Sequence, residues 1–416
     1  MDVVITGMGV VSPYGRGVSV LWRGLLEGRS ALTPLTLFDA SMFRNPLAGV
    51  VADYPPAIGN QPPRAFRMLY DAADEAMRDA LGLEASAAET FSAGALKQAA
   101  IVTGTNFGGM SAAEIALTEG RADARQGGLD RYLFGAASAG LAKRFGFSGP
   151  RFNLSLACAS GAAAIGLALD LIRRERAEAV IVAGYDELSL FVYAGLSALR
   201  AITPEIIRPF DKRRKGTLFS EGAGVMILES AAHAARRKAP HIYARVLGRA
   251  MNNDAYHMTA PEQEARGIQA LMRAVLADAK VAPETIDHVN LHGTGTPYND
   301  AIETKAMHAV FGARGRKIPV CAIKSSIGHT MGAAGIIESV AAVLTLREGK
   351  VPPIIGLDPQ QKDPECDLFT PTDAPLDGDF KVVMKTSYGF GGANAALVLA
   401  KGGHVAECSA GILPAS

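Results

Sequence analysis

Several features that would mark a disulfide-stapled, zinc-stapled or nucleic-acid-binding protein are missing from this sequence. Its 416 residues include four cysteines, and no two of them form a CxxC pair. A disulfide scaffold and a structural zinc site are therefore disfavoured, and a reducing compartment such as the cytoplasm suits the chain. The formal net charge is +1 without a long block of like charge, which argues against nucleic acid as the main partner.

Long hydrophobic runs are also missing. The most apolar long window, residues 331–346, contains Glu338 and many small residues, so it predicts a buried helix rather than a membrane span. The N-terminus passes from Met1 and Asp2 into VVITGMGVV with no basic region, so no signal peptide is expected. With 49% hydrophobic and 20% charged residues, the chain has enough apolar surface for one large or two medium domains.

The most informative stretch is RFNLSLACASGAAAIGLALDLI, residues 151–172, which contains Cys158. The apolar run Phe152 to Leu156 predicts a buried strand, and a close-packed helix is expected from Ser160 to about Arg174. The thiol would then lie at the helix N-terminus, whose partial positive charge lowers a thiol pKa and whose N–H groups stabilise an oxyanion. An inert buried cysteine is the alternative that this window alone leaves open.

Other segments predict the framework around this turn. Val3 to Ile5 is expected as a short strand, and the following GMGVVSPYG as a tight turn rather than a dinucleotide-binding loop. Residues 64–81 have the apolar spacing of an amphipathic helix. The strand, turn and Gly/Ala helix around Cys158 are echoed by residues 320–346 around His329. This echo predicts two similar βα halves with parallel strands, 1–240 and 241–400, followed by a tail at 401–416.

Three polar stretches follow predicted strands: the turn with Cys158, the loop HGTGTP with His292, and KSSIGHT with Lys324 and His329. Parallel sheets place their chemistry at the carboxyl ends of strands, so these stretches are expected to meet. A Cys–His pair supports acyl transfer through a thioester. Zinc binding by the Cys–His–His set and a cysteine protease remain alternatives, although zinc is disfavoured because no close-spaced ligand pair exists.

LACASGAAAIG, HGTGTP, KSSIGHTMGAAG and SYGFGGAN, in this order and at these separations, resemble the motifs of the β-ketoacyl-acyl-carrier-protein synthases. The resemblance is greatest to the synthase II branch and the ketosynthase subunits of type II polyketide systems, and it covers nearly the whole chain. It implies a thiolase-type α/β fold, with duplicated βαβαβ halves in a five-layer α-β-α-β-α arrangement. It also implies a homodimer, or a heterodimer with a related ketosynthase or chain-length-factor subunit.

The activity implied by this resemblance is acyl transfer followed by decarboxylative Claisen condensation. An acyl group on Cys158 would react with malonyl-acyl-carrier protein, during elongation of a fatty acid or a type II polyketide or polyene chain. The acyl carrier protein would be the partner, and its phosphopantetheine would carry the substrates, with no other cofactor, no catalytic metal, no membrane and no nucleic acid. The resemblance also raises a monovalent cation near Asn394 and Glu338, for which the sequence itself gives no support.

Individual roles follow from the same resemblance. His292 and His329 would assist decarboxylation and bind the malonyl thioester carbonyl, and Lys324 with Glu303 would orient the histidine region. The backbone N–H groups of Cys158 and Phe390 would form the oxyanion hole, with Phe390 as a gate. The residues implied in substrate binding are Thr294, Thr296, Phe107 and Gly391.

Two features depart from what the resemblance leads us to expect. Phe107 lies where synthase II relatives usually carry a smaller side chain at the floor of the acyl pocket, which predicts a preference for short or rigid acyl chains. The stretch FDKRRKG is unusually basic, so it is expected either to dock an acidic carrier protein or to be an ordinary solvated turn. The proposed docking residues are Arg64, Arg67, Arg208, Arg213 and Arg214.

Three rival functions are weighed against this reading. A chain-length-factor-like partner subunit shares the fold but lacks the nucleophile, whereas Cys158 and both histidines are present here. A thiolase that uses free coenzyme A needs a second cysteine late in the chain, and Cys366 and Cys408 lie in no such motif. A cysteine hydrolase would need water at the site. The sequence does not distinguish a fatty-acid pathway from a polyketide or polyene pathway.

Overall fold

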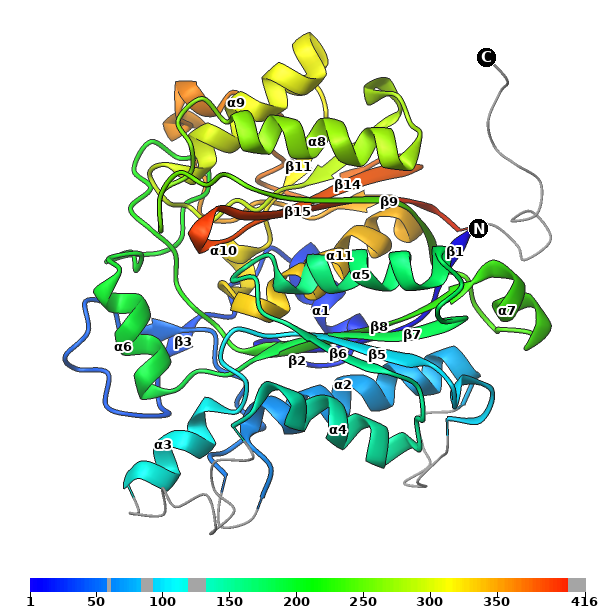
Figure 1. Ribbon diagram of the computed structural model, residues 1–416. Helices are drawn as coiled ribbons and strands as arrows, with labels where there is room; N and C mark the ends of the chain where they lie inside the picture. The colour runs from blue at the N-terminus through cyan, green and yellow to red at the C-terminus, as the bar shows by residue number, and fades with distance from the viewer. Residues whose placement is uncertain (58–60, 84–92, 119–131, 403–416) are drawn as a thin grey trace.

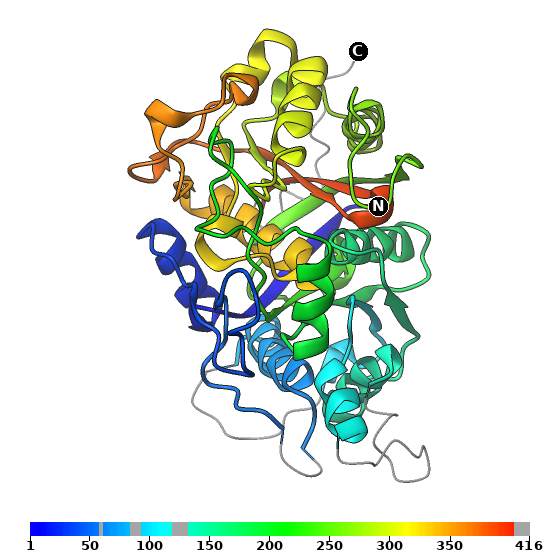
Figure 2. The same cartoon turned by 90° about the vertical axis from the view of Figure 1, so that its left-hand side faces the viewer.

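The computed structural model describes residues 1–57, 61–83, 93–118 and 132–402. These residues form stacked layers in which two sheets enclose a central pair of helices and are covered by helices on their outer faces (Figure 1). Figure 2 shows the same layers from a second side. The α-β-α-β-α arrangement predicted from the resemblance is therefore confirmed.

The first sheet comes from the N-terminal half of the chain. From its inner edge, β1 pairs antiparallel with β8, β8 pairs antiparallel with β7, and the remaining pairs are parallel. The edge strand is the one that leads to Cys158. In spatial order the strands are β1 (Val3–Ser12), β8 (Gly222–Ser230), β7 (Ala179–Asp186), β5 (Ala100–Gly104) and β6 (Arg151–Leu154).

The second sheet repeats this order with strands of the C-terminal half. Its first two pairs are antiparallel and its last two are parallel, and it joins the first sheet where β1 pairs with β9. The internal duplication is thus confirmed, but each sheet is mixed rather than all parallel. In spatial order the strands are β9 (Ala244–Asn253), β15 (Ala393–Lys401), β14 (Val382–Tyr388), β10 (His288–Asn290) and β11 (Val320–Cys321).

The two central helices are α5 (Ser160–Arg173) and α11 (Ala334–Glu348), and they touch through glycine. A Cβ at Gly335 would lie 2.2 Å from the backbone nitrogen of Ala162, and one at Gly161 would lie 2.7 Å from that of Ile336. Small residues are needed because both helices are enclosed by two sheets and by each other. The close packing predicted for the helix after Cys158 is confirmed.

The outer helices bury one apolar face each and cover the two sheets. The predicted amphipathic helix is α2 (Arg64–Leu81), with its apolar residues in a core shared with the first sheet. Helices α2 and α4 (Phe134–Phe145) cover the first sheet, and α8 (Arg266–Ala279) and α9 (Asn299–Phe311) cover the second. The other helices are α1 (Val18–Leu26), α3 (Met110–Thr118), α6 (Leu190–Ala198), α7 (Ala231–Arg236) and α10 (Lys324–Ile327).

The first strand differs from its prediction. It does not end at Ile5 in a tight turn but continues to Ser12, and all ten of its residues are buried. A Cβ at Gly7 would lie 2.3 Å from the carbonyl oxygen of Ala76, and one at Gly9 would lie 1.9 Å from that of Ala72. The two glycines therefore allow α2 to approach the strand, and no turn is required.

The strand before Cys158 also differs from its prediction. Residues 152–156 were expected as a buried strand, whereas β6 is a half-exposed edge strand that ends at Leu154. Alternate residues of β6 are exposed, because no strand of the described chain covers its outer edge. The turn that carries the thiol consequently starts two residues earlier than expected.

The remaining strands are short and lie outside the two main sheets, apart from β2, which pairs with β1. No helix among the described residues is long and apolar enough to cross a bilayer. The boundary near residue 240 stays a prediction, and most of the predicted tail, with Cys408, lies outside the described residues. The short strands are β2 (Gly15–Arg16), β3 (Thr33–Pro34), β4 (Leu47–Ala48), β12 (Lys350–Val351) and β13 (Leu376–Asp377).

Candidate active site

The turn between β6 and α5 presents Cys158 at the end of the first sheet. Ala157, the preceding residue, has a φ of 47°, a left-handed conformation that costs energy for a residue with a Cβ. The Ser160 hydroxyl donates to the Ala157 carbonyl at 2.7 Å and accepts from the Leu156 N–H at 2.8 Å, which closes the turn. Gly389 packs against the turn, since a Cβ there would lie 3.1 Å from the Cys158 nitrogen.

His329 is the nearest partner of the thiol. Its Nε2 lies 3.0 Å from Cys158 Sγ, and its Nδ1 accepts from the backbone N–H of Met331 at 3.1 Å. The ring stacks on Phe219 with centroids 5.7 Å apart. Because the Met331 N–H can only donate, the network assigns the ring proton to Nε2, which then points at the sulfur.

His292 completes the cluster from the loop after β10. Its ring meets that of His329 edge to face with centroids 5.6 Å apart, and one ligand atom each from Cys158, His292 and His329 lie within 4.8 Å of one another. Lys324 Nζ lies 3.3 Å from His292 Nδ1 and donates to the His292 carbonyl at 2.8 Å. The network therefore assigns this ring proton to Nε2 as well.

This tautomer pattern bears on the zinc alternative. A zinc ion needs a free lone pair on each imidazole nitrogen that faces it. Both Nδ1 atoms accept hydrogen bonds from fixed donors, so both Nε2 atoms carry protons toward the space beside Cys158. The cluster is thus arranged to donate two N–H groups to an oxygen atom, and metal binding is disfavoured.

Burial sets the charge states in the cluster. Burial lowers the pKa of both His292 and His329 well below the usual value, and the positive charges of Lys324 and Lys385 lower both further. Both rings are therefore uncharged at neutral pH. Burial raises the pKa of the Cys158 thiol to about 11, although Lys324 and the backbone N–H of Phe390 lower it. The expected net lowering by the helix N-terminus is thus wrong, because desolvation of the thiolate outweighs it.

Lys324 and Glu303 both contact the His292 loop, but they do so separately and not as a pair. Glu303 accepts from the backbone N–H groups of His292 at 2.8 Å and Gly293 at 3.0 Å. Lys324 forms its ion pair with Glu338 on α11. The family resemblance had led us to expect Lys324 to act together with Glu303, and the ion pair of Lys324 with Glu338 was not predicted.

Glu338 is enclosed by two lysines. Its second oxygen, Oε2, lies 2.8 Å from Nζ of Lys385, which is buried in β14. The side chain of Asn394 instead donates to Asn252 and Asp254. A monovalent cation coordinated by Glu338 is disfavoured, because two ammonium groups already neutralise the carboxylate. Lys385 was missed in the sequence, where its signal was a lysine within the buried strand VVMKTSY.

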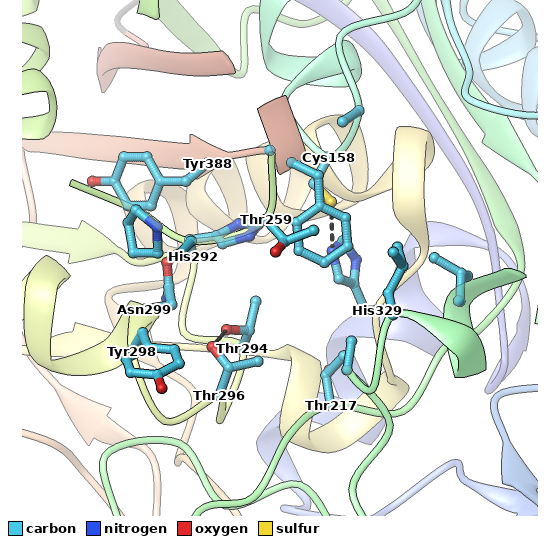
Figure 3. A pocket seen from close by; sticks show the side chains of 18 of the residues that line it. Cys158, Thr217, Thr259, His292, Thr294, Thr296, Tyr298, Asn299, His329 and Tyr388 are labelled. Carbon is cyan, nitrogen blue, oxygen red and sulfur yellow. Dashed lines mark hydrogen bonds between the residues drawn. The ribbon is translucent and has the colours of Figure 1, made fainter. Parts of the chain in front are cut away.

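A cavity of about 530 Å³ opens onto the cluster (Figure 3). Figure 3 shows Cys158 and His329 joined at one side, with His292, Thr294 and Thr296 arranged around the same space. The hydroxyls of the two threonines lie 2.9 Å apart. Sequence-predicted residues that line the cavity are Phe107, Cys158, His292, Thr294, Thr296, His329 and Phe390.

Gly391 does not line the cavity, although it was assigned to substrate binding. Its φ is 80°, and its N–H donates to the Met258 carbonyl at 2.7 Å, so it shapes the turn after Phe390. Tyr388 is a lining residue that the sequence reading missed. Its ring meets that of His292 edge to face, with centroids 5.6 Å apart. In the sequence, its position two residues before Phe390 was the feature that could have indicated this role.

Two of the five arginines proposed for docking are structural. Arg64 is 3% exposed and pairs with buried Glu221, which also holds the N–H groups of Val51 and Leu188. The side chain of Arg214 is 7% exposed and pairs with Asp363. Their assignment to a docking surface is therefore wrong, because neither guanidinium is free to meet a partner.

The other three arginines reach the surface to different degrees. Arg67 is half-buried and donates to the Pro55 carbonyl, and Arg208 lies 3.3 Å from Glu205. The side chain of Arg213 is 42% exposed, although it also pairs with buried Asp211 at 2.7 Å. The basic stretch is thus partly an internal ion-pair network, and Arg213 is its most accessible arginine.

Comparisons with known proteins agree over nearly the whole chain. Residues 1–234 match the model of the beta-ketoacyl synthase N-terminal domain, and residues 243–358 match that of the C-terminal domain. The chain is 37% identical to 3-oxoacyl-[acyl-carrier-protein] synthase 2 of Coxiella burnetii, over 96% of this chain and 98% of the relative. It is 35% identical to nodulation protein E of Rhizobium meliloti, over 95% and 98%.

Solved structures give the same picture. The ishigamide ketosynthase/chain length factor superposes with a TM-score of 0.86 at 33% identity, covering 97% of this chain and 99% of the other. A type II polyketide synthase acyl-carrier protein in complex with its ketosynthase bound to the hexaketide gives a TM-score of 0.86 at 29% identity, covering 96% and 99%.

Proposed function

The chain belongs to the β-ketoacyl synthase family, and from this premise we propose that Cys158, His292 and His329 carry out its reaction. It is a β-ketoacyl-[acyl-carrier-protein] synthase, an acyltransferase of fatty-acid or polyketide chain elongation. The observation that supports the assignment of roles is the convergence of one sulfur and two imidazoles within 4.8 Å beside one cavity.

The first half-reaction transfers an acyl group to the protein. The Cys158 sulfur attacks the thioester carbonyl of an acyl-carrier protein, and the thiol proton passes to the departing phosphopantetheine sulfur. The N–H groups of Cys158 and Phe390 stabilise the oxyanion, and the Phe390 N–H already faces the thiol. The carrier's phosphopantetheine sulfur leaves as a thiol, and an acyl-Cys158 thioester remains.

The second half-reaction forms the carbon–carbon bond. The thioester carbonyl of malonyl-acyl-carrier protein accepts from the two Nε2–H groups, because both rings are uncharged and donate into the cavity. Loss of carbon dioxide leaves an enolate that these donors stabilise. Its carbon attacks the acyl carbonyl, the Cys158 thiolate leaves, and a β-ketoacyl chain two carbons longer remains on the carrier protein.

Phe107 sets the proposed acyl preference. Its ring lines the cavity and packs in the same apolar cluster as Met331, two residues after His329. A phenyl ring at this place shortens the space available to an acyl chain. We therefore propose short or rigid acyl donors, a preference that fits a specialised polyketide or polyene pathway better than general fatty-acid elongation.

The acyl carrier protein is the partner, and a second ketosynthase-type subunit is expected beside it. Solved relatives include ketosynthases paired with chain length factors and one bound to its carrier protein. The half-exposed edge of β6 offers a strand for pairing with a second subunit. For carrier docking, the candidates that remain are Arg67, Arg208 and Arg213.

Cofactor use and compartment complete the proposal. The phosphopantetheine of the carrier suffices as the acyl handle, because the donors and the nucleophile all come from this chain. Cys158, Cys321 and Cys366 are unpaired thiols, which suits a reducing cytoplasm.

The main alternative is a non-catalytic, chain-length-factor-like subunit. One experiment separates it from the catalytic reading: the protein is incubated with a hexanoyl-carrier thioester, analysed by intact mass and peptide mapping, and then given malonyl-carrier protein. Catalysis predicts an acyl adduct on Cys158 that is consumed to give a β-ketoacyl carrier product. Absence of the adduct would support the non-catalytic subunit, and release of free acid without malonyl-carrier protein would indicate a hydrolase.

A further inference from the structure

Lys385 is a fully buried lysine in the middle of the second sheet. It lies in β14, and its exposed fraction is 0%. Its neighbours on the strand, Met384 and Thr386, are buried as well. Removing an ammonium group from water costs several kcal/mol by order of magnitude, so this position requires a compensating partner and a reason for the charge.

The partner is the carboxylate that also holds Lys324. Lys385 Nζ lies 2.8 Å from Glu338 Oε2, and Lys324 Nζ binds the other oxygen of Glu338. Lys385 also donates to the Thr386 carbonyl and, at 3.1 Å, to the Ser387 hydroxyl. One carboxylate is therefore bridged by two ammonium groups that arrive from a strand and from α10.

The bridge continues to the cavity through a single further contact. Lys324 donates to the His292 carbonyl at 2.8 Å and faces His292 Nδ1 at 3.3 Å. Strand β14 also reaches the other side of the loop that carries His292. The Thr386 hydroxyl donates at 3.0 Å to Glu303, which holds the backbone of that loop. Lys385 thus lies at the start of a continuous chain of contacts that ends at the histidine nitrogen opposite the cavity.

We propose that Lys385 is a positioning residue for the condensation: it fixes Glu338 and, through it, the contact of Lys324 with His292, and its charge adds to the burial that leaves both rings uncharged. The inference rests on the proposed function, because that function requires both rings to donate from Nε2. A charged imidazolium would carry a proton on Nδ1 as well and would no longer accept from Lys324 or Met331.

The charges around the cluster explain why Lys324 without Lys385 would leave no excess of positive charge beside the histidine rings. A single lysine would be neutralised by Glu338, whereas the second leaves an excess of positive charge beside the rings. Burial raises the pKa of Glu303 to about 7, so its negative charge is only partial near neutral pH. Besides Lys385, the titratable and charged groups that face this cluster are Glu338, Lys324, Glu303, Asp186, Cys158, Cys321 and Tyr388.

The sign of the effect is fixed by these charges. Both histidine pKa values are lowered by burial first and then by the two lysines. Removal of the Lys385 charge therefore raises both histidine pKa values. At a given acidic pH, a larger share of the rings is charged, and decarboxylation should fail at a higher pH than in the wild type.

The test compares Lys385→Met with the wild type in decarboxylation of malonyl-carrier protein between pH 4.5 and 8. We expect the acidic limb of the profile to move upward by about one pH unit. Lys385→Arg, which keeps the charge, should restore the wild-type limb. Ser387→Ala removes one hydrogen bond of Lys385 but no charge, so it should leave the limb in place.

A second measurement does not depend on activity. The ring carbons and nitrogens of His292 and His329 are followed by NMR of histidine-labelled protein in the wild type and in Lys385→Met. Titration at a higher pH in the variant supports the inference. Superimposable titrations and pH profiles overturn it, even if stability falls.

The two proposals fail in different ways. A wild type that forms no acyl adduct on Cys158 and decarboxylates nothing overturns the assigned catalytic roles, whatever the histidine titrations show. An active wild type with an unshifted Lys385→Met variant overturns the role of Lys385 alone. Lys385→Gln replaces the methionine variant if the latter does not fold, and failure of both to fold also overturns the inference, because the lysine is then required for the fold itself.

Discussion

Phe107 and Cys158 face the same cavity from loops that follow different strands of the first sheet. The position of Phe107 is fixed by its backbone: its N–H donates at 3.0 Å to Asp186, a buried carboxylate that also accepts from Gly332 at 2.7 Å. Asp186 therefore ties the loop with the phenyl ring to the segment that follows His329. A change of the ring should alter the cavity without moving the loop.

Phe107→Ala is predicted to widen the acyl preference. The variant removes a ring from the cavity lining, and each additional methylene that becomes buried contributes about 0.8 kcal/mol. We expect kcat/KM for a dodecanoyl donor to rise by about tenfold, which corresponds to about 1.4 kcal/mol, while the value for a butyryl donor changes little. The measurement is acyl transfer to Cys158 across a series of chain lengths.

Phe43→Ala is the matched control for this series. Phe43 packs in the same apolar cluster as Phe107 but does not line the cavity. Its loss should lower stability without altering the order of the acyl donors. Equal use of short and long donors by the wild type, unchanged in Phe107→Ala, would contradict the proposed role of the ring.

At the residue scale, the sequence was sufficient to predict the candidate catalytic residues but not the buried ion pairs around them. Cys158, His292 and His329 were expected to meet, and their atoms do meet. The ion pairs were not foreseeable, because a pair such as Arg64 with Glu221 joins residues 157 positions apart. Lys385 was missed for the same reason: a lysine within an apolar strand has no explanation until the carboxylate opposite it is known.

At the scale of elements, the contact between α5 and α11 determines how the cysteine and the histidine meet. Helix α5 starts two residues after Cys158, and α11 starts five residues after His329. The helices touch at Gly161 and Gly335, where no side chain fits between the backbones. The distance between sulfur and imidazole is therefore coupled to the packing of two glycines.

Gly335→Ala is predicted to disturb both stability and chemistry. Its Cβ would lie 2.2 Å from the Ala162 nitrogen, so one helix must shift. Overpacking of this kind costs about 1–3 kcal/mol, and a misplaced nucleophile slows acylation by about tenfold or more. Urea denaturation and the rate of acyl transfer to Cys158 measure the two effects.

Gly195→Ala provides the control for this substitution. Gly195 lies in α6, and a Cβ there would meet nothing within 4 Å. This variant should keep its rate and gain up to about 1 kcal/mol of stability from helix propensity. If Gly335→Ala behaved like Gly195→Ala, the coupling between helix packing and the active site would be wrong.

The elements themselves were predictable where periodicity was strong. Residues 64–81 have a regular apolar stripe and form α2 over that range. The predicted first strand was shorter than β1, because Gly7 and Gly9 suggest a turn when the helix packed against them is unknown. Strand β6 was expected to be buried, because an apolar run does not reveal whether its strand lies at the edge of a sheet.

At the scale of the whole molecule, buried histidines and buried carboxyl groups have opposite effects on the free energy of unfolding as the pH falls. Burial lowers the pKa of His288 to about 4, and it lowers those of His292 and His329 well below the usual value. Between about pH 6.5 and about pH 4, these histidines take up protons only in the unfolded chain. Each therefore costs stability as the pH falls through that range.

Buried carboxyl groups act in the opposite direction. Burial raises the pKa of Glu187 and Glu303 to about 7 and that of Asp186 to about 6. Between these values and about pH 4.3 such groups bind protons in the folded protein but not in the unfolded chain. Each therefore adds stability as the pH falls, at up to about 1.4 kcal/mol per pH unit.

The balance predicts an unusual stability profile for a protein with buried neutral histidines. The free energy of unfolding should change little between pH 6.5 and about pH 5. It should then fall below about pH 4.3, where the carboxyl groups are protonated in both states while His292 and His329 still charge only on unfolding. Urea denaturation midpoints at half-unit steps of pH measure this profile.

Glu187→Gln isolates one side of the balance. Glu187 accepts from the N–H groups of Ala65 and Ser111, outside the residues proposed to act in catalysis. Without its titration, stability should decline from pH 6.5 to 5 by about 1.4 kcal/mol per pH unit relative to the wild type. A steady decline of the wild type over the same range, parallel to that of the variant, would show that the carboxyl groups do not offset the histidines.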